Sequence, residues 1–276
     1  MSLSFLKSPG QRIALCLLAL AASLFAPAVI ADTPSQPIAE TLVPAEHADW
    51  TRLLKKYVRA GSDGITYFDY AGLAASETDR LALDAYIARF ADADLAARTD
   101  SNFAAWANLY NAVTVRHIVE RYPVKSIKDG YLTGPWKDVK VRASGGEVSL
   151  DAIEHKILRK TWGTPEVHYA INCASYSCPN LRPKAWEAAT LKKDLAAAAR
   201  DYINQPRGVT VNSRGLVVSS IYDWFEADFG GSKEAVIEHL LKYAEPELAA
   251  KIRAKPKIVR YDYNWSLNDA AKLRKR

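Results

Sequence analysis

The chain has 276 residues, of which 49% are hydrophobic, 25% charged and 10% aromatic. This composition is typical of a globular protein and excludes collagen-like, coiled-coil and intrinsically disordered classes. The net charge of +6 comes from the two ends of the sequence, Lys7 and Arg12 near the start and the basic residues within 272–276. Because the rest of the chain is electrically balanced, it offers no basic face to nucleic acid, and we expect no nucleic-acid partner.

Residues 1–31 have the pattern of a signal peptide. Basic residues precede a long apolar run, and Val29 and Ala31 place small side chains before Asp32. A signal peptidase accepts this arrangement, so we predict cleavage after Ala31 and a periplasmic or secreted protein. The alternative is an uncleaved membrane anchor, because residues 13–30 are uncharged over nearly the length of a spanning helix.

The rest of the chain is predicted to form one domain with loose ends. Prolines among small polar residues predict a flexible tether over residues 32–45. We expect a single globular domain over residues 46–271 and a basic tail over 272–276. The longest later stretch without Lys, Arg, Asp or Glu, residues 167–181, is too short and too polar for a membrane span, so none is expected in the mature chain.

The first half of the domain has mostly helical patterns. An amphipathic helix is predicted over residues 47–57, followed by a turn and an aromatic, β-branched strand or turn over 65–70. Residues 74–90 and 91–97 are predicted to be helical again.

The helix predicted over residues 102–122 is unusual, because residues 102–115 contain no charged side chain. We expect Asp100 or Ser101 to cap it and every face of its first turns to be buried. Asn108 and Asn111 share one face of this helix, and a buried amide needs hydrogen-bond partners. Either they tie down the backbone of a neighbouring loop or they form the floor of a pocket.

The second half alternates short strands and helices. Two hairpins, a strand that contains His168 and a late strand, with no repeated strand-helix-strand order, predict a mainly antiparallel sheet and an α+β fold. The sheet would pack on the buried central helix. The predicted strands are 139–142, 147–149, 167–172, 209–212, 216–219 and 257–263, and the predicted helices are 149–160, 191–203 and 233–243.

Candidate chemistry is concentrated around Cys173 and Cys178. In an oxidising compartment these two cysteines could form a disulfide that closes a short loop. Alternatively, one of them is a thiol nucleophile with His168 as its base. In a regular strand over 167–172, Cys173 would point away from His168, so Cys178 is the better nucleophile after a reversal of the chain. Arg182 could favour its thiolate.

A metal or redox site is less well supported by the spacing. His168, Cys173 and Cys178 with His155 lack the Cys-x2-Cys knuckle of a zinc site. Four residues also separate the two cysteines, whereas thioredoxin-type redox chemistry uses Cys-x-x-Cys. We therefore expect neither a metal ion nor another cofactor.

Several consecutive motifs resemble the domain-of-unknown-function 547 family of bacteria and plants. They follow the family's order over about residues 100–270, with Asn180 standing where the family often has a second proline. The resemblance implies no activity, because none is assigned in the family's name. The motifs lie at residues 102–112, 122–127, 149–155, 167–183, 228–231 and 261–268.

A buried helix, then His168, then Asp262 near the end of the chain also resembles the order of transglutaminase-type and papain-type thiol enzymes. In those enzymes the nucleophilic cysteine opens the helix. Here Ser101 and Asn102 stand at that position. The resemblance therefore implies either a nucleophile moved to Cys178 or a shared framework without the reaction.

Two functions remain open from the sequence. The first is a thiol-dependent hydrolase or acyl-transferase acting on peptide or amide bonds, with Cys178 as nucleophile and His168 as base. The second is a non-catalytic envelope module with a Cys173–Cys178 disulfide, which binds a peptide, a glycan or an envelope protein. The expected orienting or binding residues are Asn108, Asn111, Glu154, His155 and Arg182.

Overall fold

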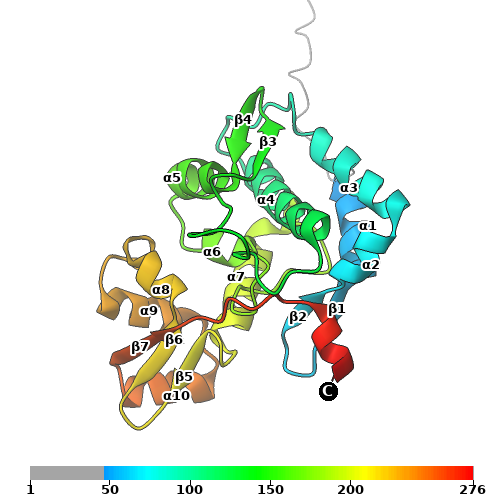
Figure 1. Ribbon diagram of the computed structural model, residues 1–276. Helices are drawn as coiled ribbons and strands as arrows, with labels where there is room; N and C mark the ends of the chain where they lie inside the picture. Colours follow the sequence, from blue (N-terminus) through cyan, green and yellow to red (C-terminus); the bar gives the residue numbers. More distant parts are fainter. Residues whose placement is uncertain (1–46, 276) are drawn as a thin grey trace, which may run out of the picture. The chain divides into compact units, whose positions relative to one another are not determined.

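The computed structural model describes residues 47–275 of the chain (Figure 1). These residues belong to one compact unit. The predicted signal peptide and tether lie outside the described residues, as does the end of the basic tail. Within the described part, no helix is long and apolar enough to pass through a membrane.

The first part of this unit is a group of helices with a small antiparallel hairpin. Its elements are α1 (Ala48–Tyr57), β1 (Val58–Ala60), β2 (Thr66–Phe68), α2 (Tyr70–Ala75) and α3 (Glu77–Ala88). The helix predicted over 74–90 is interrupted at Ser76, whose side chain accepts a hydrogen bond from the Asp79 N–H and starts a new helix.

The helix predicted over residues 91–97 is wrong. The N–H groups of Ser144 and Gly145 donate to the carbonyls of Phe90 and Ala91, at 2.9 and 2.8 Å. The start of this segment is therefore tied to the turn of a distant hairpin, and tertiary contacts override a weak local preference for helix.

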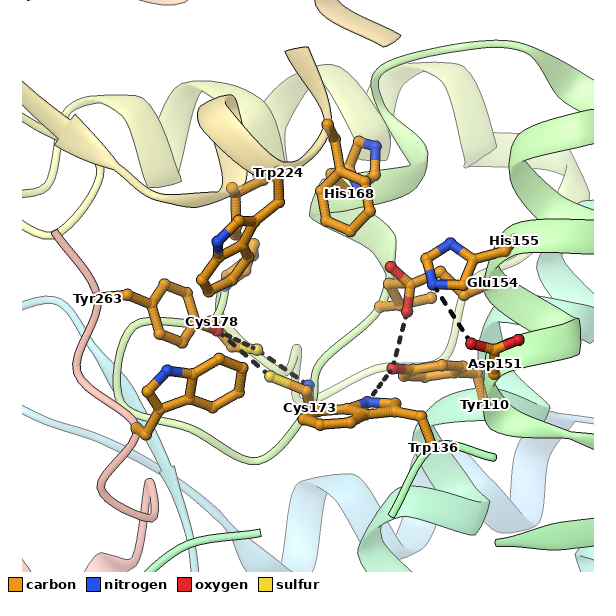
Figure 2. Close-up of a pocket in the computed structure, with 15 residues that line it drawn as sticks. Tyr110, Trp136, Asp151, Glu154, His155, His168, Cys173, Cys178, Trp224 and Tyr263 are labelled. Atoms are coloured by element: carbon orange, nitrogen blue, oxygen red, sulfur yellow. Dashed lines mark hydrogen bonds and ion pairs between the residues drawn. The ribbon is translucent and has the colours of Figure 1, made fainter. Parts of the chain in front are cut away.

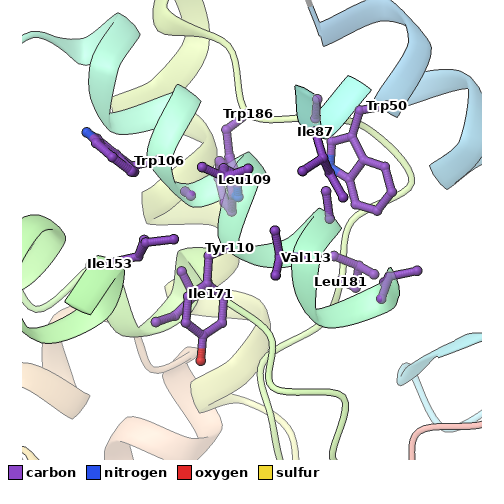
Figure 3. Packing of buried hydrophobic residues seen from close by; sticks show 14 of the residues in the cluster. Trp50, Ile87, Trp106, Leu109, Tyr110, Val113, Ile153, Ile171, Leu181 and Trp186 are labelled. Atoms are coloured by element: carbon purple, nitrogen blue, oxygen red, sulfur yellow. The ribbon is translucent and has the colours of Figure 1, made fainter. Parts of the chain in front are cut away.

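Helix α4 (Asp100–Arg121) is buried along most of its length, as its lack of charge predicts. Its cap is Thr99, whose side chain accepts from the Asn102 N–H, rather than Asp100 or Ser101. Because all its faces are apolar, α4 packs mainly against the surrounding helices α2, α3 and η2 rather than on a sheet, which corrects the predicted packing. Figure 3 shows side chains that enclose it, Trp50, Ile87, Ile153, Ile171 and Trp186.

The predicted hairpin after α4 is confirmed as β3 (Lys140–Ala143) and β4 (Gly146–Ser149). The strands are antiparallel, with Val141 opposite Val148. The helical segment that follows is the π-helix η2 (Ala152–Leu158) and then α5 (Arg159–Trp162).

Residues 167–170 form the short helix α6 (Val167–Ala170), so the strand predicted over 167–172 is wrong. Turn hydrogen bonds from the N–H groups of Val167 and His168 to Thr164 and Pro165 start the helix. Every residue of α6 is buried, and a short apolar run that is buried on all sides gives no periodicity to distinguish strand from helix.

The last part of the chain surrounds a three-stranded sheet of order β5-β6-β7. β5 and β6 are antiparallel, as the hairpin pattern predicts, whereas β6 and β7 are parallel. With its separate small sheets the molecule is α+β. The elements are η3 (Ala188–Thr190), α7 (Leu191–Ile203), β5 (Val209–Val211), β6 (Leu216–Ser219), α8 (Ile221–Trp224), η4 (Glu226–Phe229), α9 (Lys233–Tyr243), α10 (Pro246–Ala254), β7 (Ile258–Asp262) and η5 (Ala270–Lys275).

Two large hydrophobic cores result, one around α4 and one around the β5-β6-β7 sheet. Helix α6 joins them, because Val167 and Ala170 belong to the first core and Tyr169 belongs to the second. His168 lies on the same helix, so its surroundings are fixed by both cores.

Candidate active site

A cavity of about 250 Å³ contains both cysteines (Figure 2). Its walls are mainly aromatic, and its polar members are thiols, imidazoles, carboxylates and a phenol. The lining residues are Tyr110, Trp136, Asp151, Glu154, His155, His168, Ile171, Cys173, Cys178, Pro179, Ile221, Trp224, Phe225, Tyr263 and Trp265.

Segments far apart in the sequence supply these walls. Helix α4 contributes Tyr110, and η2 contributes Glu154 and His155. α8 contributes Trp224, and the segment after β7 contributes Tyr263. The cavity therefore forms only when both cores are in place.

The loop that carries the cysteines is held in shape by Asn172. Its Oδ1 accepts from the Ala174 N–H at 2.8 Å, and its Nδ2 donates to the Pro179 carbonyl at 2.7 Å. Ala174 has a φ of 62°, so the chain turns sharply at that residue. These contacts turn the chain back on itself and bring Cys178 to Cys173.

Both cysteines are free thiols in this structure. The Cys173 N–H donates to Cys178 Sγ at 3.0 Å. The Tyr263 hydroxyl lies 3.2 Å from Cys178 Sγ and 3.3 Å from Cys173 Sγ. Ser175 Oγ lies 2.7 Å from the Tyr263 hydroxyl, so the thiols and hydroxyls form one network.

The two thiols have opposite pKa shifts. Burial raises the pKa of Cys178, but hydrogen bonds from Cys173, Tyr263 and Ser175 outweigh burial, and the pKa is lowered overall. The hydrogen bond to Cys178, together with burial, raises the pKa of the Cys173 thiol well above its usual value. Cys178 is thus the thiolate of the pair and Cys173 its donor.

Glu154 is a buried carboxyl group beside the same cavity. Burial raises its pKa to about 7, against the effect of a hydrogen bond from the Tyr110 hydroxyl at 3.1 Å. The Trp136 indole N–H in turn donates to that hydroxyl at 3.2 Å. A carboxyl group with this pKa can both give and take a proton near neutral pH.

His168 lies in a different network. Its Nε2 is 2.7 Å from Asp228 Oδ2, and its ring stacks on Phe225 with centroids 4.2 Å apart. Burial lowers the pKa of His168 despite this carboxylate. Asp228 also forms two hydrogen bonds with Arg159. No hydrogen bond joins His168 to Cys178 among the described residues, although both line the cavity.

The other predicted site residues fall into two groups. Glu154 and His155 line the cavity. Asn108, Asn111 and Arg182 lie outside its lining.

Both asparagines hold loop backbone, which is the structural alternative left open by the sequence. Asn108 pairs with the N–H and carbonyl of Trp186, both at 2.9 Å. Asn111 bonds the Ala170 carbonyl and the Asn172 N–H.

Arg182 forms an ion pair with Asp194 at 2.9 Å and lies over the Trp186 ring. Its guanidinium group is therefore paired with Asp194 outside the cavity lining.

The aromatic residues that form the walls of the cavity were not predicted as site residues from the sequence. Tyr263 and Trp265 belong to the motif at residues 261–268, but the sequence indicated no role for either side chain. Trp136 and Trp224 had no local signal, because a lone tryptophan gives no indication of which cavity it will line.

Among the described residues, no three His, Cys, Asp or Glu side chains are grouped to hold a metal ion.

Fold and cavity together define an α+β protein with a thiol pair at the centre of an aromatic pocket. Residues 95–203 match the family described as protein of unknown function, DUF547, which confirms the resemblance for the four motifs between residues 102 and 183. The motifs at 228–231 and 261–268 lie beyond the matched residues. A search of curated proteins and a search of solved structures each found no match. The family segment contains both cysteines, Glu154 and His168, whereas Trp224 and Tyr263 lie beyond it.

Proposed function

We propose that the cavity carries out thiol-dependent acyl transfer or hydrolysis at an amide or ester carbonyl, with Cys178 as the nucleophile. The observation that carries the proposal is the hydrogen-bonded Cys178 Sγ at an accessible cavity, where the Cys173 N–H and the Tyr263 hydroxyl favour its thiolate. A thiolate, rather than a thiol, is the attacking species in such reactions.

The proposed reaction has two steps. The Cys178 thiolate attacks the carbonyl carbon, the new C–S bond forms, and the tetrahedral intermediate expels the leaving amine or alcohol. Glu154 gives its proton to that leaving group. Water or a second nucleophile then attacks the thioester, releases its proton to the Glu154 carboxylate, and regenerates the Cys178 thiolate.

Glu154 is a better proton-transfer group for this reaction than His168. The charge of Cys178 contributes to the raised pKa of Glu154, so the two groups interact electrostatically. His168 already shares a hydrogen bond with Asp228 and is covered by Phe225. We assign His168 a positioning role, in which it holds η4 and Phe225 at the wall of the cavity.

The non-catalytic alternative is supported by the contact between the cysteines. Tyr263 reaches both sulfur atoms, and Cys173 N–H touches Cys178 Sγ, so both thiols lie close to one another. Loss of two electrons and two protons to an external oxidant would join them in a disulfide. Such a protein would bind a peptide, a glycan or an envelope protein without covalent chemistry.

Acylation by p-nitrophenyl acetate tests the proposed reaction. We expect the full chain to release nitrophenolate in a burst and to carry an acetyl group on the peptide that contains Cys178. The Cys173→Ala variant should keep the acetyl group on that peptide, and Cys178→Ala should lose both the burst and the label. An equal burst from Cys178→Ala would contradict the proposal.

We also propose, from the predicted signal peptide alone, that the protein is exported to the periplasm or the medium. Sequencing of the purified mature chain should then begin at Asp32. An uncleaved N-terminus in the membrane fraction would contradict this expectation.

A further inference from the structure

The aromatic side of the cavity is a group of mutually packed rings. Trp224 and Trp265 stack with centroids 5.4 Å apart, and Tyr263 lies 4.6 Å from Trp265. Trp136 meets Trp265 edge-on at 5.7 Å. Trp224 is 46% exposed, so this group reaches the opening of the cavity. Such an arrangement presents several electron-rich faces within a few ångströms of one another.

The opposite side of the cavity is acidic. Figure 2 shows Asp151 and Glu154 across the open centre from Trp224 and Tyr263. The residues that line the cavity include no lysine or arginine. Burial also lowers the pKa values of His155 and His168, so neither imidazole supplies a positive charge at neutral pH.

Two cations that contact rings of the lining, Arg159 and Lys128, are already engaged. Arg159 forms hydrogen bonds with Asp228 and contacts His155 Nδ1. Lys128 places its ammonium 4.6 Å from the Trp265 ring centroid. This second contact also shows that the aromatic group takes up an ammonium on one of its faces.

We propose that the substrate carries an ammonium group, which binds between the aromatic rings of Trp136, Trp224 and Trp265 and the carboxyl groups of Asp151 and Glu154. The aromatic faces and the Asp151 carboxyl group favour a cation, and Glu154 offers an acceptor oxygen whether or not it is protonated. The lining offers no positive partner to a phosphate or a carboxylate. This inference rests on the proposed function only in treating the bound cation as part of a substrate.

The test compares two probes of equal shape, choline and its uncharged isostere 3,3-dimethylbutan-1-ol. Binding to the full chain is measured by titration calorimetry. We expect choline to bind at least about tenfold more tightly, which is the size of a desolvated cation–π contact. Equal binding of the two probes, or tighter binding of the neutral probe or of a neutral disaccharide, would overturn the proposal.

Substitutions of the exposed Trp224 side chain test whether choline binds at this aromatic group. Trp224→Leu should weaken choline binding by roughly three- to tenfold, whereas Trp224→Phe, which keeps an aromatic face, should stay within about threefold of the wild type. Trp162→Leu is the control, because Trp162 lies on α5 outside the cavity lining and should leave binding unchanged. Circular dichroism confirms that each variant folds. If Trp224→Leu folds and binds choline as the wild type does, the proposal fails.

Choline binding and Cys178 acylation are measured separately on the wild-type chain, which distinguishes this inference from the proposed function. If choline binds selectively but Cys178 is not acylated, the inference stands and the proposed function falls. If Cys178 is acylated but choline shows no preference over its isostere, the inference falls and the proposed function stands.

Discussion

The Cys178 thiolate depends on a small number of hydrogen-bond donors, and Tyr263 is the one that can be removed with least change in shape. Tyr263→Phe deletes a hydroxyl that lies 3.2 Å from Cys178 Sγ. We expect the pKa of Cys178, measured from the pH dependence of its alkylation by iodoacetamide, to rise by about one unit. Alkylation near neutral pH should slow severalfold.

Tyr261→Phe provides the matched control. Its hydroxyl is buried and has no hydrogen-bond partner within the part of the chain that the structure describes. The alkylation profile of this variant should match that of the wild type. An unchanged profile in Tyr263→Phe would show that the phenol does not stabilise the thiolate.

Glu154 makes the stability of the protein depend on pH. Burial raises its pKa from the ordinary 4.5 to about 7 in the folded protein. Between these values the folded state holds a proton that the unfolded state has lost, so the free energy of unfolding falls as pH rises through this window. The loss is about 3 kcal/mol. Glu154→Gln cannot lose this proton and should escape this fall.

Urea unfolding at about pH 5 and about pH 8 measures this difference. Relative to the wild type, Glu154→Gln should become more stable at the higher pH. Glu238→Gln on the exposed side of α9 should show no such gain. A gain of the same size in both variants would contradict a buried, protonated Glu154.

The residue types in the sequence were enough to predict some of the residues that line the cavity. Cys178, Glu154 and His155 were predicted site residues, and the structure places all three at the cavity. The pKa of Glu154 could not be predicted, because it depends on burial that only the folded chain defines.

The loop that carries the cysteines, residues 172–179, depends on one side chain for its shape. Asn172→Ala removes both hydrogen bonds that close this loop. We expect a loss of about 1–3 kcal/mol in the free energy of unfolding, because a buried N–H and a buried carbonyl lose their partners. Because this loop positions Cys178, we expect the alkylation rate of Cys178 to differ from that of the wild type, whether it becomes faster or slower.

Asn212→Ala is the control for the Asn172→Ala variant. The Asn212 side chain likewise makes two hydrogen bonds to backbone, both accepted from the N–H groups of Arg214 and Gly215, but it lies in an exposed hairpin turn. Its loss should leave Cys178 alkylation unchanged. If Asn172→Ala also leaves both stability and alkylation unchanged, the loop is held by other contacts.

Elements with strong local signals were predicted well. The uncharged helix α4 and the two glycine-containing hairpins were recognised from their sequences. The error at 91–97 fell where hydrogen bonds from a distant hairpin decide the structure. In α6 the burial of all four residues removes the pattern on which a strand prediction depends.

At the scale of the molecule, the cavity lies where the two hydrophobic cores meet. One wall comes from α4 and η2 of the first core, and the other includes α8 and Tyr263, which accompany the second core. Trp265, two residues after Tyr263, packs against the first core. The contacts that join these segments connect distant parts of the sequence, such as Cys178 and Tyr263, which are 85 residues apart, and no local pattern encodes them. The sequence therefore predicted the cysteine loop but not its partners.

The proposed reaction requires Cys178 to be a free, reactive thiol at this cavity. The most direct test treats the native mature protein with iodoacetamide and maps the modified peptides by mass spectrometry. We predict that Cys178 is alkylated without prior reduction and faster than Cys173. If neither cysteine is modified until a reductant is added, the native pair is a disulfide, and the catalytic account is contradicted in favour of a binding module.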